Sequence, residues 1–207
     1  MKTIYPSDIE RKQNYKLLTG SIVPRAIAWV SSQDADGNLN LAPFSYFTAV
    51  SANPPMVIFC TSLRSSDNGR KDTYHNVQAT GEFVINFVSE DLADAMNITA
   101  QEVAPEIDEF ERAGVTPLAS EKISVPRVQE SPIHFECKLH QIVEAGDGHI
   151  MIGEVLAMHF ADTVYQEGNY INTEALKPIG RLAGPNYAHI TDFFQLKRPP
   201  SEIEGKE

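Results

Sequence analysis

Alternating apolar and polar positions are clearest between residues 133 and 160. The runs 133–145 and 149–160 both alternate, and GDG at 146–148 separates them. Successive side chains of a strand point to opposite faces, and a short Gly- and Asp-containing connection between two such runs is typical of a β-hairpin. We therefore predict a hairpin here. In its first strand the two predicted faces are Phe135, Cys137, Leu139 and Gln141, and His134, Glu136, Lys138 and His140.

A second hairpin is predicted near the N-terminus. Residues 25–32 are rich in strand formers, DADGN at 34–38 is turn chemistry, and 39–50 forms the returning strand. Before it, a helix is predicted over 7–18, with Ser7 and Glu10 as a capping box and Gly20 as its stop. The other predicted elements are strand 56–62, helix 72–79, strand 82–88, one or two acidic helices with a solvated face in 89–113, and short strands in 163–172 and 187–194.

Six or more short strands with few helices between them favour a mainly β fold, an antiparallel barrel with peripheral helices. A doubly wound sheet would need regular alternation of strands and helices. The sequence also lacks GxGxxG and GxxxxGK[ST], the signatures of a Rossmann dinucleotide site and a P-loop. We expect one domain over 1–207, with its core at about 15–190 and the tail 197–207 as a loose end or a partner-contacting arm.

Composition narrows the classes of partner. The chain of 207 residues has 28 acidic and 17 basic residues and a net charge of -11, which argues against nucleic acid and anionic membranes. No apolar run approaches the roughly 18 residues of a membrane span, and the N-terminus lacks a hydrophobic signal segment, so we predict a cytoplasmic protein. Cys60 and Cys137 lie in predicted strands and are expected to be buried, reduced thiols, and no spacing indicates a metal site.

The sequence GRKDTYHN at 69–76 is unusual in so acidic a chain. It places Arg70 and Lys71 just before a predicted helix, where a lysine opposes the helix dipole. Asp72 is expected to be the N-cap, and Thr73 adds a hydroxyl and an amide in the first turn. A helix N-terminus beside a lysine can bind an anion. The alternative is a surface ion pair of Lys71 with Asp67 or Asp72.

The sequence LAPFSYF at 41–47 carries a proline inside a strand-like run. Pro43 cannot donate a ladder hydrogen bond, so it indicates an edge strand or a bulge. Free backbone groups beside Ser45 could then face a ligand. The alternative is an edge proline that only prevents pairing with other chains.

Four ordered motifs together resemble one known family. The segment VPRAIAWVSSQDADGNLNLAPFSYFTAVSANPPMVIF is followed by RKDTYHNVQATGEFVINFV, then by GDGHIMIGEVLAMH and IGRLAGPNYA. Over roughly residues 15–190 the chain resembles the flavin reductase-like family of FMN-binding split barrels. That family includes flavin reductase components of two-component monooxygenases and flavoredoxins. The resemblance implies a six-stranded antiparallel Greek-key split β-barrel, a homodimer, and FMN near the dimer interface.

The resemblance also assigns residues to the FMN site. Those implied at the phosphate are Lys71, Asp72 and Thr73 of the KDT motif, with Ser62 and Arg64 as helpers. The segment from Asn40 to Ser45, including Ala42 and Pro43, is implied to run along the isoalloxazine ring, with Ser45 as the side chain that contacts it.

Further residues are implied near the ring. His149 matches the family's hairpin histidine and is expected as a catalytic residue near the flavin or the nicotinamide, the alternative being turn solvation. Arg181 and Tyr187 match the family's RLGG..Y motif, although Ala183 replaces a glycine and Pro185 is inserted. Trp29 is expected either to pack against the flavin or to fill the barrel.

The activity implied is hydride transfer from NADH or NADPH to FMN, with a monooxygenase component or another acceptor as a further partner. Hydride transfer itself needs no strong acid or base from the protein, because the flavin carries the redox chemistry. One alternative is a flavoredoxin-like electron carrier that another protein reduces, and a second is a flavin-binding module without turnover. The sequence leaves the choice of nicotinamide and the final acceptor open.

Overall fold

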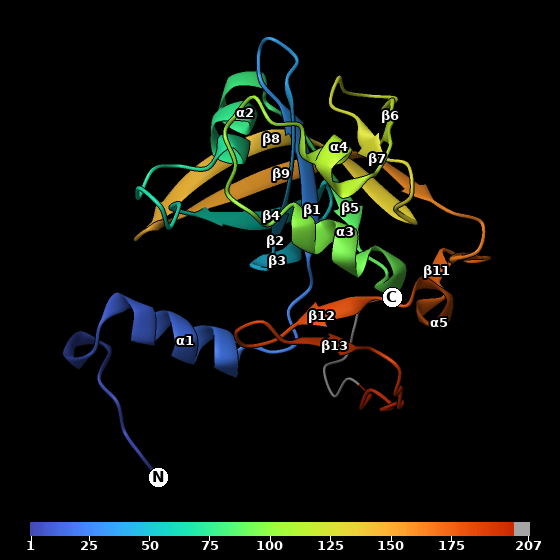
Figure 1. The fold of residues 1–207 in the computed structure, drawn as a ribbon. Coiled ribbons are helices and arrows are strands. Elements are labelled where there is room, and N and C mark those ends of the chain that lie inside the picture. Colours follow the sequence, from blue (N-terminus) through green and yellow to red (C-terminus); the bar gives the residue numbers. More distant parts are fainter. Residues whose placement is uncertain (201–207) are drawn as a thin grey trace.

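The computed structural model describes residues 1–200, and seven strands of this part form one antiparallel sheet (Figure 1). Their order across the sheet is β2-β1-β5-β8-β9-β4-β3. The strands are β1 (Ala28–Gln33), β2 (Leu39–Phe44), β3 (Phe47–Ala52), β4 (Pro55–Ser62), β5 (Glu82–Phe87), β8 (Ile133–Ala145) and β9 (Gly148–Phe160).

The sheet curls because its two outermost strands are consecutive in the chain. β2 and β3 lie at opposite ends of the strand order, yet only Ser45 and Tyr46 separate them. The Tyr46 carbonyl accepts a hydrogen bond from the Cys60 amide of β4 at 2.9 Å. The predicted barrel is therefore confirmed, but the predicted single strand 39–50 is wrong. It bends at Ser45–Tyr46, which gives seven strands instead of six.

The predicted hairpin 133–160 is confirmed as β8–β9, with Ala145 opposite Gly148. Two bulges, after Glu136 and after Leu139, interrupt the alternation. The first adds Leu156 to β9, and the second adds His140 to β8, which shifts the side chains of β8 that follow it. Ile142 therefore packs on the core in place of Gln141, which is exposed.

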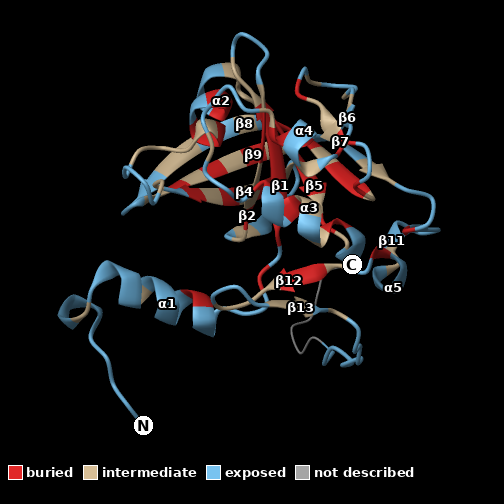
Figure 2. Cartoon of the chain, in the orientation of Figure 1, coloured by how far each residue is buried: buried red, intermediate tan, exposed pale blue. Residues whose placement is uncertain are grey.

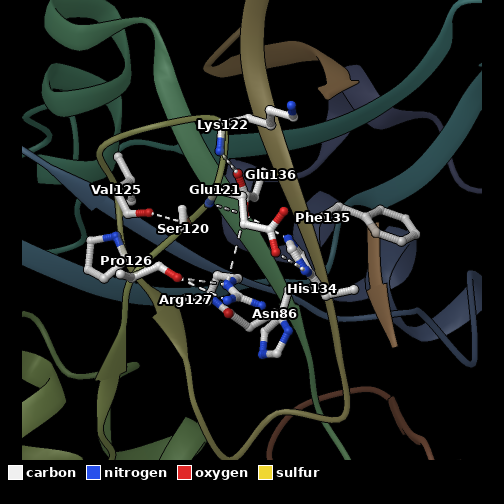
Figure 3. A network of polar contacts seen from close by, with 12 residues as sticks. Asn86, Ser120, Glu121, Lys122, Val125, Pro126, Arg127, His134, Phe135 and Glu136 are labelled. Atoms are coloured by element: carbon white, nitrogen blue, oxygen red, sulfur yellow. Dashed lines mark hydrogen bonds and ion pairs between the residues drawn. The ribbon is translucent and has the colours of Figure 1, made fainter. Parts of the chain in front are cut away.

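The face of β8 that faces away from the barrel core is also partly buried, because the segment between short strands β6 (Pro117–Leu118) and β7 (Arg127–Val128) covers it. The carboxylate of the fully buried Glu136 accepts hydrogen bonds from the amides of Glu121 and Lys122, at 2.8 and 2.7 Å (Figure 3). His159 Nε2 lies 2.7 Å from the same carboxylate. Burial raises the pKa of Glu136, but these hydrogen bonds outweigh it and hold that pKa below its usual value.

Two apolar clusters lie on the two sides of the sheet. Inside the barrel, Phe59 packs between Phe44 and Phe83, with ring centroids 5.2 Å apart in each pair. Gly153 is required there, because a Cβ would collide with the Phe83 ring. Outside the barrel, Trp29 is fully buried in the second cluster, and its indole donates to Thr99 Oγ1 at 2.9 Å. Trp29 therefore fills the layer between the barrel and the helices, and neither expected role was right.

Helices α2, α3 and α4 lie over the outside of the barrel, whereas α1 stands away from it (Figures 1 and 2). The helices and remaining strands are η1 (Pro6–Asp8), α1 (Arg11–Ser21), α2 (Asp72–Thr80), η2 (Glu90–Leu92), α3 (Ala93–Ile98), α4 (Glu109–Ala113), α5 (Thr173–Leu176), β10 (Tyr165–Gln166), β11 (Tyr170–Ile171), β12 (Ile179–Arg181) and β13 (Tyr187–His189). The predicted strand 163–172 is instead a small hairpin of two strands, β10 and β11. The predicted strand 187–194 is shorter than expected and corresponds to β13.

The first helix differs from its prediction at both ends. Its capping box is formed by Glu10 and Gln13, not by Ser7 and Glu10. Gly20 lies within the helix and does not end it. Residues 197–200 of the predicted tail belong to no helix or strand, and its residues 201–207 lie outside the described residues.

Neither cysteine forms a disulfide, as predicted, although only Cys137 is fully buried and Cys60 is half-buried. Within residues 1–200 no helix combines the length and apolar character that crossing a membrane requires. The same residues contain no group of three or more His, Cys, Asp or Glu side chains that could hold a metal ion.

Candidate functional site

The N-terminus of α2 is free of side-chain capping. Lys71 is the N-cap residue in extended conformation, and Asp72 is the first helical residue, so the prediction that Asp72 caps the helix is wrong. In the described part of the chain, the first amide here that donates a hydrogen bond is that of Tyr74, to the Lys71 carbonyl at 2.9 Å. The amides of Asp72 and Thr73 are therefore available to an anion, as at other helix N-termini.

Lys71 lies at this helix N-terminus without an acidic partner among the described residues. Among residues 1–200 its ammonium makes no ion pair within 4 Å, and its Nζ lies 6.0 Å from the centroid of the Phe44 ring. Asp67 and Asp72, the two expected surface partners of Lys71, instead pair with Arg64 at 3.2 and 3.5 Å. The surface ion pair proposed as the alternative role of Lys71 is thus absent from the described structure.

Thr73 and Asn40 join this helix to the barrel. Both side chains are buried, and Thr73 Oγ1 donates to Asn40 Oδ1 at 3.2 Å. The hydroxyl proton is used in this bond, so the amide of Thr73 is the donor that remains for a ligand. Two predicted site residues, far apart in sequence, are thereby brought together at the start of β2.

The loop before α2 is held by acidic side chains. Glu102 accepts from the amides of Ser65 and Ser66 at 2.8 and 3.2 Å, and the Ser65 amide lowers its pKa to about 2. Gly69 is packed so closely that a Cβ would lie 2.9 Å from Asp67 Oδ1. Glu102 and Asp67 therefore hold the backbone of this loop in place. Ser62 is exposed at the end of β4, and no hydrogen bond connects it to this cluster within the residues described.

One edge of β2 has no strand partner in the described part of the chain, where β2 pairs with β1 alone, and we call it the open edge. The Leu41 amide points away from β1 and donates to Glu109 Oε2 at 3.2 Å. Pro43 has the same parity as Leu41 in the strand, so its missing N–H would also have pointed off the sheet. This confirms the prediction that Pro43 marks an edge strand. Ala42 and Pro43 are half-buried along this edge.

Glu109 is a buried carboxyl that the sequence did not indicate. It lies in a run expected to be a solvated face, yet its exposed fraction is 8%. Burial raises the pKa of Glu109 to about 7, against the effect of the Leu41 amide, and the charges of Asp72 and Asp108 raise it further. This carboxyl is therefore about half protonated at neutral pH, at the middle of the open edge.

The far end of the open edge is built around Ser45. Ser45 Oγ accepts a hydrogen bond from Arg25 Nε at 3.2 Å. Arg25 also pairs through its backbone with Arg181, at 3.0 and 2.9 Å. The guanidinium of Arg181 stacks 4.5 Å from the centroid of the Tyr187 ring and also contacts its hydroxyl. Ser45, Arg181 and Tyr187, all predicted site residues, are thus joined through Arg25, which was not predicted.

His149 is the second residue of β9, lies next to Tyr74 of α2, and is 7% exposed. Its Nε2 accepts from Arg70 Nε at 3.2 Å, and its ring packs edge-to-face against Tyr74 with centroids 4.8 Å apart. Arg70 also pairs with Glu144 at 2.8 Å. Turn solvation, the alternative role for His149, does not fit this burial. Its contacts suit a residue that positions Arg70 beside Lys71, and its catalytic role stays a prediction.

Comparisons with known proteins agree on one family. Residues 19–176 match the flavin reductase like domain. The chain is similar to nitrilotriacetate monooxygenase component B from Bacillus cereus, with 42% identity, a TM-score of 0.89, and 95% of this chain and 98% of that chain covered. It is also similar to 2-nitrobenzoate 2-nitroreductase from Pseudomonas fluorescens, with 33% identity, a TM-score of 0.87, and 97% and 100% covered. A flavin reductase from Pseudomonas putida is 30% identical over 132 residues, 64% of this chain and 71% of that protein.

Proposed function

Because the chain belongs to the flavin reductase-like family, we propose that it binds FMN and reduces it with NADH or NADPH. One observation carries the choice of FMN: a lysine with no acidic partner among residues 1–200 and an uncapped helix N-terminus lie at one end of the β2 edge, and Ser45 with its partner Arg25 lies at the other. The edge from Asn40 to Ser45 spans about 17 Å at the rise of a strand. That length can separate a phosphate from the far edge of a fused ring system.

The phosphate end is chemically suited to a dianion. Lys71 would supply a point charge, and the amides of Asp72 and Thr73 would supply directed hydrogen bonds. Arg64 can assist only as far as Asp67 and Asp72 leave its donors free. Ser62 remains a proposed helper at the rim.

The ring end is suited to a flat molecule with polar atoms on its edge. The Leu41 amide is already used by Glu109 and Pro43 has no N–H, so the carbonyl of the half-buried Pro43 would meet the polar edge of the isoalloxazine, and Ser45 would add a side-chain hydrogen bond. Arg181 and Tyr187 would line the same end. Bound FMN would supply the redox chemistry, accepting hydride from the nicotinamide. The chain's own residues would hold and orient it.

The first prediction concerns the phosphate. We expect the protein to bind FMN at least roughly tenfold more tightly than riboflavin, because a charge-assisted hydrogen bond contributes about 1.5–3 kcal/mol. Fluorescence titration of the purified protein with both flavins measures this ratio. Equal affinities would mean that the α2 N-terminus is not a phosphate site.

Anaerobic mixing tests the reductase activity. With FMN and either NADH or NADPH present, rapid bleaching of flavin absorbance is the expected result. FMN that binds but stays oxidised would instead support an electron carrier reduced by another protein, or a flavin-binding module without turnover. The similarity to a protein named as a monooxygenase component B supports a partner oxygenase as the consumer of reduced flavin.

We further predict a homodimer. α1 stands away from the barrel, and its residues Tyr15 and Leu18, with Ile22 directly after it, are exposed and form an apolar set that a second copy would cover. Sedimentation should give twice the 22.9 kDa chain mass. Leu18→Glu should shift the protein toward monomer and weaken FMN binding, while the exposed control Lys12→Glu should change neither. A wild-type monomer that binds FMN tightly would contradict the prediction.

A further inference from the structure

Arg25 is a buried cation at the junction of three segments. Its exposed fraction is 7%. Nη1 donates to the Thr19 and Ile22 carbonyls at 2.5 and 2.8 Å, and Nη2 donates to the Leu182 carbonyl at 3.0 Å. These bonds tie the end of α1 and the β12–β13 hairpin to the start of β1. Together with Nε, which donates to Ser45, they use four of the five N–H donors of a guanidinium.

The charge of Arg25 is not neutralised by the residues that surround it. All four hydrogen-bond acceptors are uncharged, and no carboxylate within residues 1–200 lies within 4 Å of the guanidinium. Buried charges are ordinarily paired, because removing an ion from water is costly. An uncompensated buried cation therefore favours any neighbouring ligand group that is negative or becomes negative.

Arg25 also fixes the orientation of Ser45. A serine hydroxyl has one proton and two lone pairs. Since Ser45 Oγ accepts from Arg25 Nε, its own proton points away from the guanidinium. Ser45 is half-buried at the end of the open β2 edge. The hydroxyl is thus set as a hydrogen-bond donor toward whatever lies against that edge.

We propose that Arg25 is a positioning residue that selects for the reduced form of the flavin. It orients Ser45 as a donor to an acceptor atom on the ring, and its charge stabilises the extra negative charge that the ring gains on reduction. Hydride from NADH or NADPH brings two electrons and one proton, so the ring becomes more negative by one charge unless a second proton follows. The inference rests on the proposed FMN site, which it deepens by naming the redox state that the site prefers.

The test measures the affinity of the protein for oxidised and for reduced FMN, anaerobically, in wild type and variants. Wild type should bind reduced FMN more tightly. Arg25→Gln should lower this preference roughly tenfold, which corresponds to a midpoint potential about 30 mV lower for the bound flavin in a two-electron couple. Arg25→Lys, which keeps the charge, should retain most of the preference. The exposed Arg112→Gln is the matched control for loss of one positive charge and should leave it unchanged.

Ser45→Ala provides a second test that keeps the hydrogen bonds of Arg25 to the Thr19, Ile22 and Leu182 carbonyls. It should weaken FMN and riboflavin alike, by roughly three- to tenfold, because the lost hydrogen bond is to the ring. Unchanged flavin affinity in Ser45→Ala would overturn the role given to the Ser45 hydroxyl. An unchanged preference for reduced FMN in a folded Arg25→Gln protein would overturn the role given to the Arg25 charge. Either result leaves FMN binding by wild type intact, whereas failure of wild type to bind FMN would overturn the proposed function itself.

Discussion

Lys71→Ala is expected to weaken FMN binding by roughly ten- to a hundredfold while leaving riboflavin binding almost unchanged. The ammonium of Lys71 has no acidic partner in the described chain and lies beside the uncapped N-terminus of α2. A charge-assisted hydrogen bond of about 1.5–3 kcal/mol accounts for a loss of this size. Fluorescence titration with both flavins gives the two affinities.

The empty protein should not suffer from this substitution. A cation at a helix N-terminus opposes the helix dipole, and the contact of Lys71 with the Phe44 ring is at the distance limit for a cation–π interaction. The melting temperature of the apo variant should therefore be no lower than that of wild type. Lys138→Ala, on the exposed surface of β8, is the charge control. Loss of riboflavin affinity as well would place Lys71 at the ring, and no loss of either flavin would remove the phosphate site.

Local signals were sufficient for the predicted hairpin and the helix N-terminus. The hairpin β8–β9 follows from alternation and a Gly-Asp-Gly turn, both of which act over a few residues. The start of α2 next to Lys71 was placed correctly to within one residue, although Asp72 was wrongly expected to cap it. Pro43 marked an edge strand because a proline cannot donate to a ladder. Each of these features depends on neighbours in the sequence.

Features that depend on contacts distant in sequence could not be predicted in this way. The bend at Ser45–Tyr46 is required by barrel closure, because β2 and β3 occupy opposite ends of the strand order. The bulge after Leu139 moves Gln141 out of the core, and no local sequence pattern predicts this bulge.

The same limit applies to the burial of charged residues. Arg25 precedes an apolar strand and could have been noted there, but its partners Thr19 and Leu182 come from two separate segments. Glu109 appeared to belong to a solvated acidic face, since nothing in the sequence places it against Leu41. Sequence patterns and the family resemblance thus named residues that the structure groups at the two ends of the β2 edge, but they missed the buried charges Arg25 and Glu109.

Glu109 provides the second large expected effect, this time on stability. Its pKa in the folded protein is raised from 4.5 to about 7 by burial. The unfolded chain therefore loses this proton near pH 4.5, while the folded protein holds it until about pH 7. Between these values the folded state binds more protons, so the contribution of Glu109 to the free energy of unfolding falls as pH rises. At 1.36 kcal/mol per pH unit the full loss is about 3 kcal/mol above pH 7.

Glu109→Gln should remove this loss, because glutamine has no proton to release and its amide oxygen can still accept from the Leu41 amide. The variant should be more stable than wild type by up to about 3 kcal/mol at pH 8, with the advantage shrinking toward zero near pH 4.5. Denaturant unfolding at pH 5 and pH 8 measures the difference. Glu111→Gln, an exposed change on the same helix, should stay within about 0.5 kcal/mol of wild type at both pH values. A pH-independent difference for Glu109→Gln would show that the carboxyl of Glu109 is already ionised in the folded protein at pH 5, and that its burial is offset by its neighbours.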